Sequence, residues 1–400
     1  MSSYLKNQQL KGDILRNVYY KDCVSLTDLS KLTNKSLPVV TGAVSELISE
    51  GFLVEHGLAP STGGRRPATF LFNRENPRYI VAVAMDQLMT RLAIYNLHKE
   101  CVYPTHELRL NPFEDNEGLN ELIAFINHHV QACGLARGHI LGVGIGMPGF
   151  VNSEKGINES FFYTERVTLR EYLSENVSLP VFIENDSSLI ALAELKFGAG
   201  AGSKELLVVN IGWGTGLGMI INGQLFKGYS GYAGEFSHIP LSQSNNLCSC
   251  GKRGCLEVET SLLAMVEKAK AALRDGAESV LERSFDDQSK LAGDHFLDAA
   301  RKGDPLALSI LAESSFLLGK GISTLIHIMN PERIVLSGRG AVAGKMFMPG
   351  IQQAINQFCI HKIAEQTTIV VSELCHEAEL AGAANLVIDS CEFQIKQVLV

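Results

Sequence analysis

The chain has 400 residues, of which 46% are hydrophobic and 20% are charged, and its net charge is −8. This composition excludes a disordered chain and is typical of a globular protein with two or three domains. No apolar run reaches the roughly 20 residues of a membrane helix, and the first residues lack the apolar segment of a signal peptide. We therefore expect a cytoplasmic protein without membrane insertion.

The charges and the cysteines are informative as well. Residues 1–78 carry ten Lys and Arg against seven Asp and Glu, whereas the rest of the chain carries 25 against 36. A basic head on an acidic body favours a nucleic-acid-binding module joined to a domain of another kind. Nine cysteines, an odd number, favour reduced thiols or a metal site over disulfides.

Three helical patterns come first. Apolar residues recur at helical spacing in residues 9–20. A second helix is expected over residues 25–32, with Ser25 and Asp28 in the positions of a capping box. After a turn, a third helix is expected over residues 36–50. Two short helices joined by a tight turn predict a helix-turn-helix whose last helix enters a major groove.

Two strand patterns, residues 52–55 and 69–72, follow these helices. The loop between them includes residues 61–67, which combine glycines, a proline and an arginine pair. Together these features predict a winged helix-turn-helix over residues 1–78. The alternative is a protein-binding module whose arginines are merely solvated.

The predicted DNA contacts lie on the third helix and the wing loop. They are four side chains, Thr41, Ser45, Arg65 and Arg66. The arginine pair is suited to the negative potential of a narrow minor groove. Val40 and Gly42 are further candidates on the same helix.

From residue 79 the pattern is α/β. Strands are expected over residues 80–86, 90–96, 140–146, 205–212, 217–222 and 333–338, and helices over residues 117–133 and 307–329. We expect two α/β lobes flanking a cleft, the first over residues 79–198 and the second over residues 199–400.

A histidine and three cysteines lie close together in the second of these lobes. The four residues, all within an 18-residue span, are His238, Cys248, Cys250 and Cys255. One imidazole and three thiolates are the ligands of a closed tetrahedral zinc site, which has no open position for a reacting water. The sequence therefore predicts a structural Zn²⁺ cofactor, with buried free thiols as the alternative.

A polar pair, Asn185 and Asp186, ends the strand pattern of residues 181–186. At a strand end these side chains would reach a cleft and hydrogen-bond sugar hydroxyls, and Asp186 could act as a general base. The alternative for Asp186 is the N-cap of the helix over residues 187–197.

These motifs, in this order, resemble those of the ROK family (repressors, open reading frames, sugar kinases). The most specific is Cys-x-Cys-Gly-x-x-Gly-Cys-x-Glu, matched in full from Cys248 to Glu257. The other matches are Gly146-Met147-Pro148-Gly149, Glu184-Asn185-Asp186, Gly214-Thr215-Gly216, and Gly234-Glu235 with His238. The N-terminal module is similar to that of ROK repressors.

The resemblance implies the fold and the sugar site. The body would be two-lobed, of the actin-like, sugar-kinase-like (ribonuclease H-like) ATPase type, with dimerisation helices in the second lobe of a homodimer or tetramer. The implied sugar-binding residues are Asn185, Asp186, Glu235, His238 and Glu257, with His238 also a zinc ligand. In the family's kinases, the residue matching Asp186 deprotonates the sugar.

Departures from the family pattern favour a regulator over a kinase. Where ROK kinases have phosphate-binding glycines after the first aspartate, this chain has Leu88 and Met89, and Arg339 replaces a glycine of the adenosine side. We therefore expect a transcriptional repressor, not an enzyme, that binds operator DNA and a sugar or sugar phosphate, with Asp186 a vestigial base. The alternatives are an ATP-dependent sugar kinase with a fused head, and a regulator controlled by a transporter protein.

Overall fold

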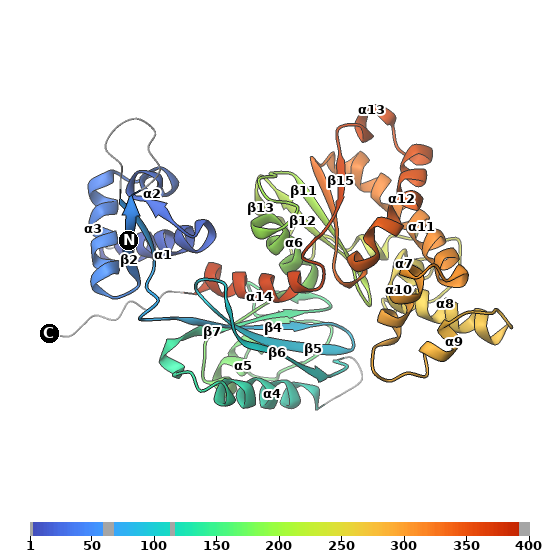
Figure 1. The fold of residues 1–400 in the computed structure, drawn as a ribbon, viewed down its shortest axis with the longest axis horizontal. Helices are drawn as coiled ribbons and strands as arrows, with labels where there is room; N and C mark the ends of the chain where they lie inside the picture. Colours follow the sequence, from blue (N-terminus) through green and yellow to red (C-terminus); the bar gives the residue numbers. More distant parts are fainter. Residues whose placement is uncertain (1–2, 59–67, 113–116, 392–400) are drawn as a thin grey trace.

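An N-terminal domain of three helices and a small sheet lies at one end of the molecule, in blue in Figure 1. The computed structural model of the chain describes residues 3–58, 68–112 and 117–391. The helices of this domain are α1 (Ser3–Lys21), α2 (Leu26–Thr33) and α3 (Leu37–Ser49). Its strands, β1 (Val24–Ser25), β2 (Leu53–Leu58) and β3 (Ala68–Phe72), pair antiparallel in the order β1-β3-β2. The helix-turn-helix and the two wing strands are present as predicted, and β1 is too short to leave a sequence pattern.

Local interactions explain where α2 and α3 begin. The Ser25 Oγ accepts the backbone N–H of Asp28 at 3.2 Å, which caps α2 as the sequence predicts. On α3, Thr41 and Ser45 are exposed, but Val40 is fully buried. The prediction that Val40 faces DNA was wrong, because Val40 lies on the apolar stripe of α3 that forms the domain core.

A buried lysine joins α1 to α3. Lys11 is only 2% exposed, and its Nζ lies 2.6 Å from Glu46 Oε2 and 2.7 Å from Glu50 Oε1. The two carboxylates raise the pKa of Lys11 against the opposing effect of burial, which is the largest single influence. The ion pairs therefore hold the predicted recognition helix against α1.

The first lobe is built on a five-stranded sheet in the order β10-β7-β4-β5-β6, with β4 parallel to β7 and antiparallel to β5. Its strands are β4 (Tyr79–Met85), β5 (Met89–Asn96), β6 (Cys101–Arg109), β7 (Ile140–Met147) and β10 (Val181–Asn185). Its helices are α4 (Gly118–Ala132), α5 (Leu169–Val177) and α6 (Asp186–Phe197), and β8 (Val151–Asn152) pairs with β9 (Ile157–Asn158) in a small hairpin.

Alternation along β4 explains how this sheet is covered on both faces. Val81, Val83 and Met85 join the core formed with α4 and α5, whereas Ile80 and Ala82 join the core on the opposite face. The strand is apolar at every position for this reason.

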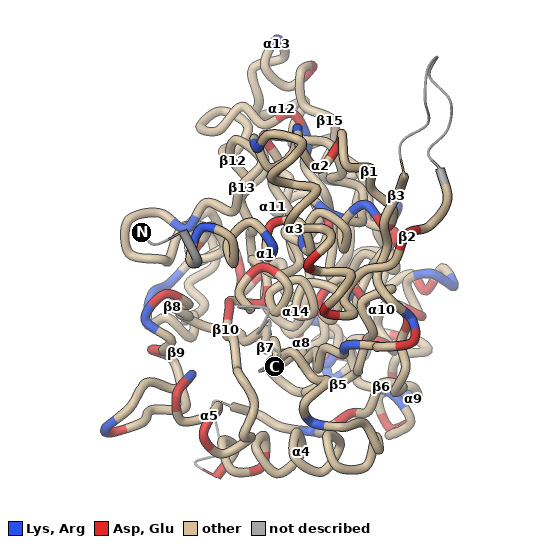
Figure 2. The backbone as a smooth tube through the Cα atoms, turned by 90° about the vertical axis from the view of Figure 1, so that its left-hand side faces the viewer, with Lys and Arg blue, Asp and Glu red and all other residues tan. Residues whose placement is uncertain are grey.

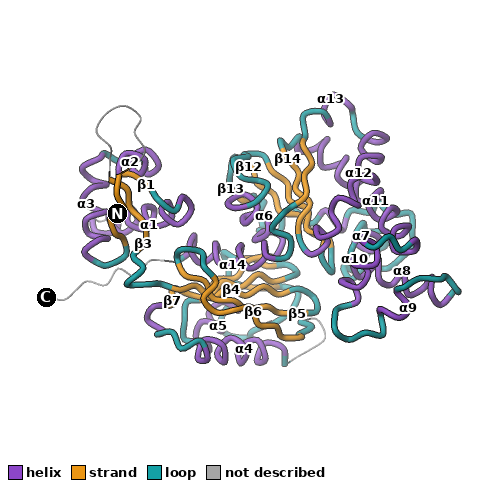
Figure 3. Tube along the Cα trace, viewed as in Figure 1, coloured by secondary structure: helices purple, strands orange, loops and turns teal. Residues whose placement is uncertain are grey.

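The second lobe also has a five-stranded sheet, in the order β13-β12-β11-β14-β15. Its strands are β11 (Leu206–Ile211), β12 (Thr215–Ile221), β13 (Gln224–Leu225), β14 (Arg333–Ser337) and β15 (Thr368–Val371). Its helices are α7 (Glu257–Thr260), α8 (Leu262–Arg274), α9 (Leu281–Ser284), α10 (Ala292–Arg301), α11 (Pro305–Met329), α12 (Gly344–Phe358) and α13 (His361–Ala364). Figure 3 shows the two sheets separated by helices, which confirms the predicted two-lobed body.

The last described helix, α14 (Glu377–Ser390), returns to the first lobe. It packs on β4, β7 and α6, although the sequence division places residues 199–400 in the second lobe. The division of the chain by residue ranges stays a prediction, but this helix is in contact with the first sheet.

Among the described residues, α11 is long and apolar enough by length and composition to cross a membrane. Its buried side chains, which include Leu318 and Ile322, belong to the core of the second lobe. A buried core helix passes the same test, so this property of α11 is weak evidence for a membrane span.

The N-terminal domain rests on the body through α1. Tyr20 donates its hydroxyl to Asp389 Oδ1 at 2.8 Å, and Arg16 Nε donates to the carbonyl of Ile388 at 3.2 Å. The Nζ of Lys196, near the end of α6, lies 4.3 Å from the ring centroid of Tyr20. Figure 2 views the molecule from the side of the N-terminal domain and shows acidic and basic residues interspersed along the backbone.

Replacing the buried lysine tests the link between α1 and α3. Lys11→Met removes both ion pairs and leaves the Glu50 carboxylate without its cation, so we expect a loss of about 3 kcal/mol in the opening free energy of α3. Hydrogen exchange of the α3 amides measures this loss. The exposed Lys31→Met on α2 is the control, and equal protection in the two variants would contradict the prediction.

Candidate functional site

A cavity of about 400 Å³ lies between the two lobes. All five predicted sugar-binding residues line it, namely Asn185, Asp186, Glu235, His238 and Glu257. Asn185 and Asp186 come from the junction of β10 and α6 in the first lobe, and the other three come from loops of the second lobe and the start of α7. The volume is within the range of small-molecule sites.

Asn185, not Asp186, is the N-cap of α6. Its side-chain oxygen accepts the N–H of Ser188 at 3.1 Å, and its Nδ2 donates to the carbonyl of Gly149 at 3.2 Å. The alternative that Asp186 serves as the cap is therefore wrong, because the helix begins one residue earlier than that reading requires.

Asp186 lies in the cavity wall at the first position of α6. Within the described residues its hydrogen bonds come from Ser187 and use only Oδ1, at 2.7 Å from the backbone N–H and 3.2 Å from the hydroxyl. Burial, and then the carboxylate of Glu379, raise the pKa of Asp186 to about 7. The second carboxyl oxygen is thus free to accept a ligand hydroxyl.

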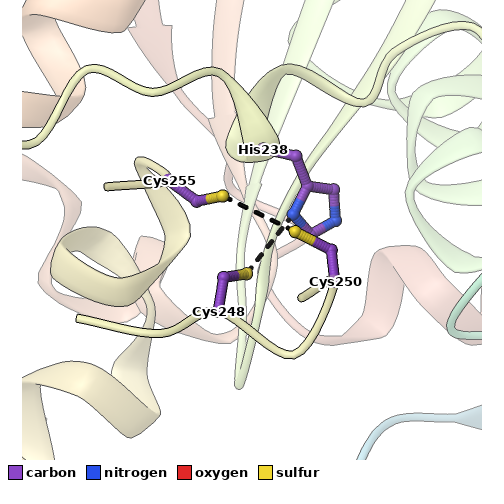
Figure 4. Close-up of side chains that lie close together, drawn as sticks. All are labelled: His238, Cys248, Cys250 and Cys255. Carbon is purple, nitrogen blue, oxygen red and sulfur yellow. Dashed lines mark hydrogen bonds between the residues drawn. The ribbon is translucent and has the colours of Figure 1, made fainter. Parts of the chain in front are cut away.

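The predicted metal ligands converge on one another, as Figure 4 shows, and His238 and Cys250 also line the cavity. The ligand atoms of His238, Cys248, Cys250 and Cys255 all lie within 4.8 Å of one another. The Cys250 and Cys255 sulfurs are 3.6 Å apart, and the Cys248 sulfur is 3.5 Å from His238 Nδ1. Sulfurs at about 2.3 Å from one tetrahedral zinc ion would be about 3.8 Å apart, so the spacing fits such an ion.

His238 connects this cluster to the cavity. Its Nδ1 faces the cluster, while its Nε2 lies 3.5 Å from Glu235 Oε2. A carboxylate beside the outer nitrogen of a histidine ligand fixes the orientation of the ring. A metal held here would therefore also fix the loop that carries Glu235.

Asp86 links the two lobes at the floor of the cavity. Its Oδ1 accepts the backbone N–H groups of Leu88 and Met89 at 2.8 and 2.7 Å. Its Oδ2 accepts the indole N–H of Trp213, from the second lobe, at 3.1 Å. Leu88 packs against the core of the second lobe, and Met89 is buried at the start of β5.

Arg339 is a cavity residue whose role the sequence did not reveal. It follows β14, and its Nη1 lies 2.9 and 3.0 Å from the two carboxylate oxygens of Asp294 on α10. Its Nη2 lies 3.6 Å from Asp86 Oδ2. The departure from the family's glycine marked this position, but the partner, 45 residues away, left no signal in the sequence.

The predicted DNA contacts fall on two parts of the chain. Thr41 and Ser45 are exposed on α3, and the Thr41 hydroxyl donates to the carbonyl of Leu37 at 2.8 Å. Arg65 and Arg66 lie outside the described residues.

The raised pKa of Asp186 predicts a pH-dependent effect of Asp186→Asn. The folded protein keeps this proton up to about pH 7, whereas the unfolded chain releases it near pH 4, so the carboxyl costs stability increasingly as pH rises between these values. We expect the variant to melt at the same temperature as the parent near pH 4 and at a higher temperature at pH 8. The exposed Asp286→Asn is the control, and a Tm difference that is constant with pH would contradict the prediction.

Comparisons with known proteins agree with this architecture. The ROK family model matches residues 86–390. The xylose repressor of Caldicellulosiruptor bescii is 29% identical over 378 residues, which cover 94% of each chain. The crystal structure of a ROK family transcriptional regulator, a homologue of the E. coli MLC protein, covers 96% of both chains with 25% identity and a TM-score of 0.77.

A kinase matches a smaller share of the chain. The ROK family glucokinase of Streptomyces griseus, solved with glucose and AMPPNP, covers 77% of this chain and 98% of its own, with 26% identity and a TM-score of 0.66. The family model spans more than half of the chain, from the end of β4 to the end of α14. The chain therefore belongs to the ROK family.

Proposed function

We propose that the chain is a sugar-responsive, DNA-binding transcriptional regulator that represses genes of carbohydrate uptake or catabolism. One observation carries the proposal: a winged helix-turn-helix is joined to a cleft lined by Asn185, Asp186, Glu235, His238 and Glu257. The similarity to the xylose repressor of Caldicellulosiruptor bescii, which extends over 94% of both chains, supports it. The relatives that are regulators make the cytoplasm the expected location.

The DNA contacts proposed are Thr41 and Ser45 in a major groove and Arg65 and Arg66 in the adjacent minor groove. The exposure of Thr41 and Ser45 supports this assignment. Because the Thr41 hydroxyl already donates to the helix, its oxygen remains to accept from a base amino group and its methyl group to contact a thymine. A homodimer or tetramer would then bind a pseudo-palindromic operator.

Two helices support a path from sugar to DNA. α6 begins at Asp186 in the cavity and ends at Phe197, whose ring centroid lies 6.4 Å from that of Tyr19 on α1. α14 has Glu379 in the cavity wall and Asp389 against Tyr20. A shift of either helix on sugar binding would therefore move the DNA-binding domain, which is how two sites become coupled. A transporter protein acting on the same surface is the alternative signal.

The kinase alternative is favoured by the glucokinase match and by Asp186 in the position of a base. Against it, the backbone N–H groups of Leu88 and Met89 donate to Asp86, so they are not free to bind a phosphate. Arg339 also lines the cavity where the family's adenosine-side glycine stands. We therefore propose that Asp186 binds the sugar without transferring a phosphoryl group.

We assign the Cys and His cluster a structural zinc ion. Three thiols and one imidazole form a complete tetrahedral donor set, which leaves no position for substrate. When bound, the ion would cross-link the loop of His238 to the segment of Cys248, Cys250 and Cys255. With its Nδ1 bound in the cluster, His238 would have a fixed orientation, and Glu235 beside it would be held in place for the sugar.

Substituting the wing arginines tests the DNA-binding function. In mobility-shift titrations with the DNA upstream of its own gene, we expect Arg65→Ala/Arg66→Ala to bind at least tenfold more weakly. The salt dependence should also be shallower, because the two positive charges lost from the minor groove no longer release DNA counterions. The variant should keep the parent's thermal shift with sugars. Arg301→Ala/Lys302→Ala, exposed in the second lobe, is the matched control.

Two results would argue against the regulator. One is a parent protein with no salt-dependent preference for that DNA. The other is equal affinity of the two double variants for it. A parent that binds the DNA but keeps the same affinity when a bound sugar is present would remove only the sugar response.

Removing the metal tests the zinc assignment. We expect about one zinc ion per chain in the purified protein, and a lower Tm after chelation because metal binding contributes to folding. Cys255→Ser should lose the ion and melt early, whereas Cys359→Ser, outside the cluster, should not. A zinc-free protein with an unchanged Tm would refute the assignment.

A further inference from the structure

The walls of the cavity are strongly acidic. Six acidic side chains line it, from Asp86, Glu159, Asp186, Glu235, Glu257 and Glu379. Among the described residues, Arg339 is the one Lys or Arg that lines it. A cavity with this balance attracts hydroxyl donors and repels anions.

The one guanidinium is not available to a ligand. The Nη1 of Arg339 is paired with both carboxylate oxygens of Asp294, and its Nη2 lies 3.6 Å from Asp86 Oδ2. The guanidinium carbon, Cζ, lies 5.5 Å from the centroid of the Trp213 ring. Two carboxylates and an aromatic face thus surround the cation. A ligand phosphate would have to displace Asp294 or Asp86 to reach it.

Two other cations, which pair with residues in or beside the lining, are engaged in the same way. Arg91 is paired with Glu379 and also donates to the carbonyl of His376. Lys227 lies 2.5 Å from Glu184 and 2.6 Å from the Ser153 hydroxyl, outside the cavity lining. Neither adds a free positive charge to the site.

Repulsion by the Glu379 carboxylate acts on two of these acidic side chains. Burial raises the pKa of Asp86 and of Asp186, and in both the Glu379 carboxylate is the next cause. The cavity therefore already resists negative charge before any ligand enters. A phosphate monoester would bring close to two further charges at neutral pH.

We propose that this cleft selects an uncharged sugar and rejects the phosphate ester of the same sugar. The inference rests on the proposed function, because it names the chemical class of the effector at that site. Sugar hydroxyls donate to the carboxylates, as an acidic wall requires, whereas a phosphate offers only further acceptors and charge. The protein would thus report the free sugar before its phosphorylation.

Matched pairs of ligands test the proposal. The probes are glucose, N-acetylglucosamine and xylose, each beside its terminal phosphate ester, with Mg²⁺-free buffer and with Mg²⁺ as parallel arms. Trp213, the single tryptophan of the chain, is 3% exposed and lines the cavity, so its fluorescence reports binding together with the shift in Tm.

We expect the free sugar to bind at least tenfold more tightly than its ester in every pair that binds. An ester that binds as tightly as its sugar, with or without Mg²⁺, would overturn the proposal and leave the sugar-responsive regulator standing. The absence of binding by all six ligands would overturn sugar sensing itself, while the mobility-shift assay would still report DNA binding separately.

Two variants show whether charge is the cause. Asp294→Asn frees Arg339, and Glu159→Gln removes an exposed charge with little risk to folding, so each should improve ester binding at least threefold relative to the free sugar. Asp298→Asn, on the same helix α10 but paired with Lys290, is the control and should leave the ratio unchanged. Unchanged ratios in the first two variants would overturn the electrostatic explanation.

Discussion

The packing of α14 between the first sheet and α6 connects every part of this molecule. A Cβ on Gly382 would lie 2.6 Å from the backbone carbon of Leu189 on α6, and one on Gly144 of β7 would lie 2.9 Å from that of Ala383. Only glycine allows backbones to approach this closely. The N-terminal domain and the first lobe share one hydrophobic core, and α14, which belongs to that core, reaches the cavity at one end and holds α1 at the other.

The cleft is held by polar contacts at two places. On the second-lobe side, the cluster around His238 positions the loop that carries Glu235. At the floor, Asp86 accepts from its own turn and from Trp213 across the lobes, so its carboxylate ties the lobes together. A ligand that enters between these places would contact groups that already bridge the lobes, an arrangement suited to a two-state response.

Parts of the site with local sequence determinants were predictable. The ligands of the Cys and His cluster are close in the chain, and the Ser25 cap and the apolar stripe of α1 depend on neighbours a few residues away. Predictions failed where the roles of two adjacent residues depend on how a helix is rotated or where it begins. Val40 and Thr41 are adjacent, and only the rotation of α3 against the core buries one and exposes the other. Asn185 and Asp186 likewise differ by one position at the start of α6.

The chain order of strands, helices and metal-ligating residues was readable from the sequence because periodicity, capping and chelation act over short distances along the chain. The pairing of Arg339 with Asp294, the position of α14 on the first sheet and the acidity of the completed cavity were not readable. These features bring together residues that are far apart in the chain, and their electrostatic and packing energies exist only once the chain has folded.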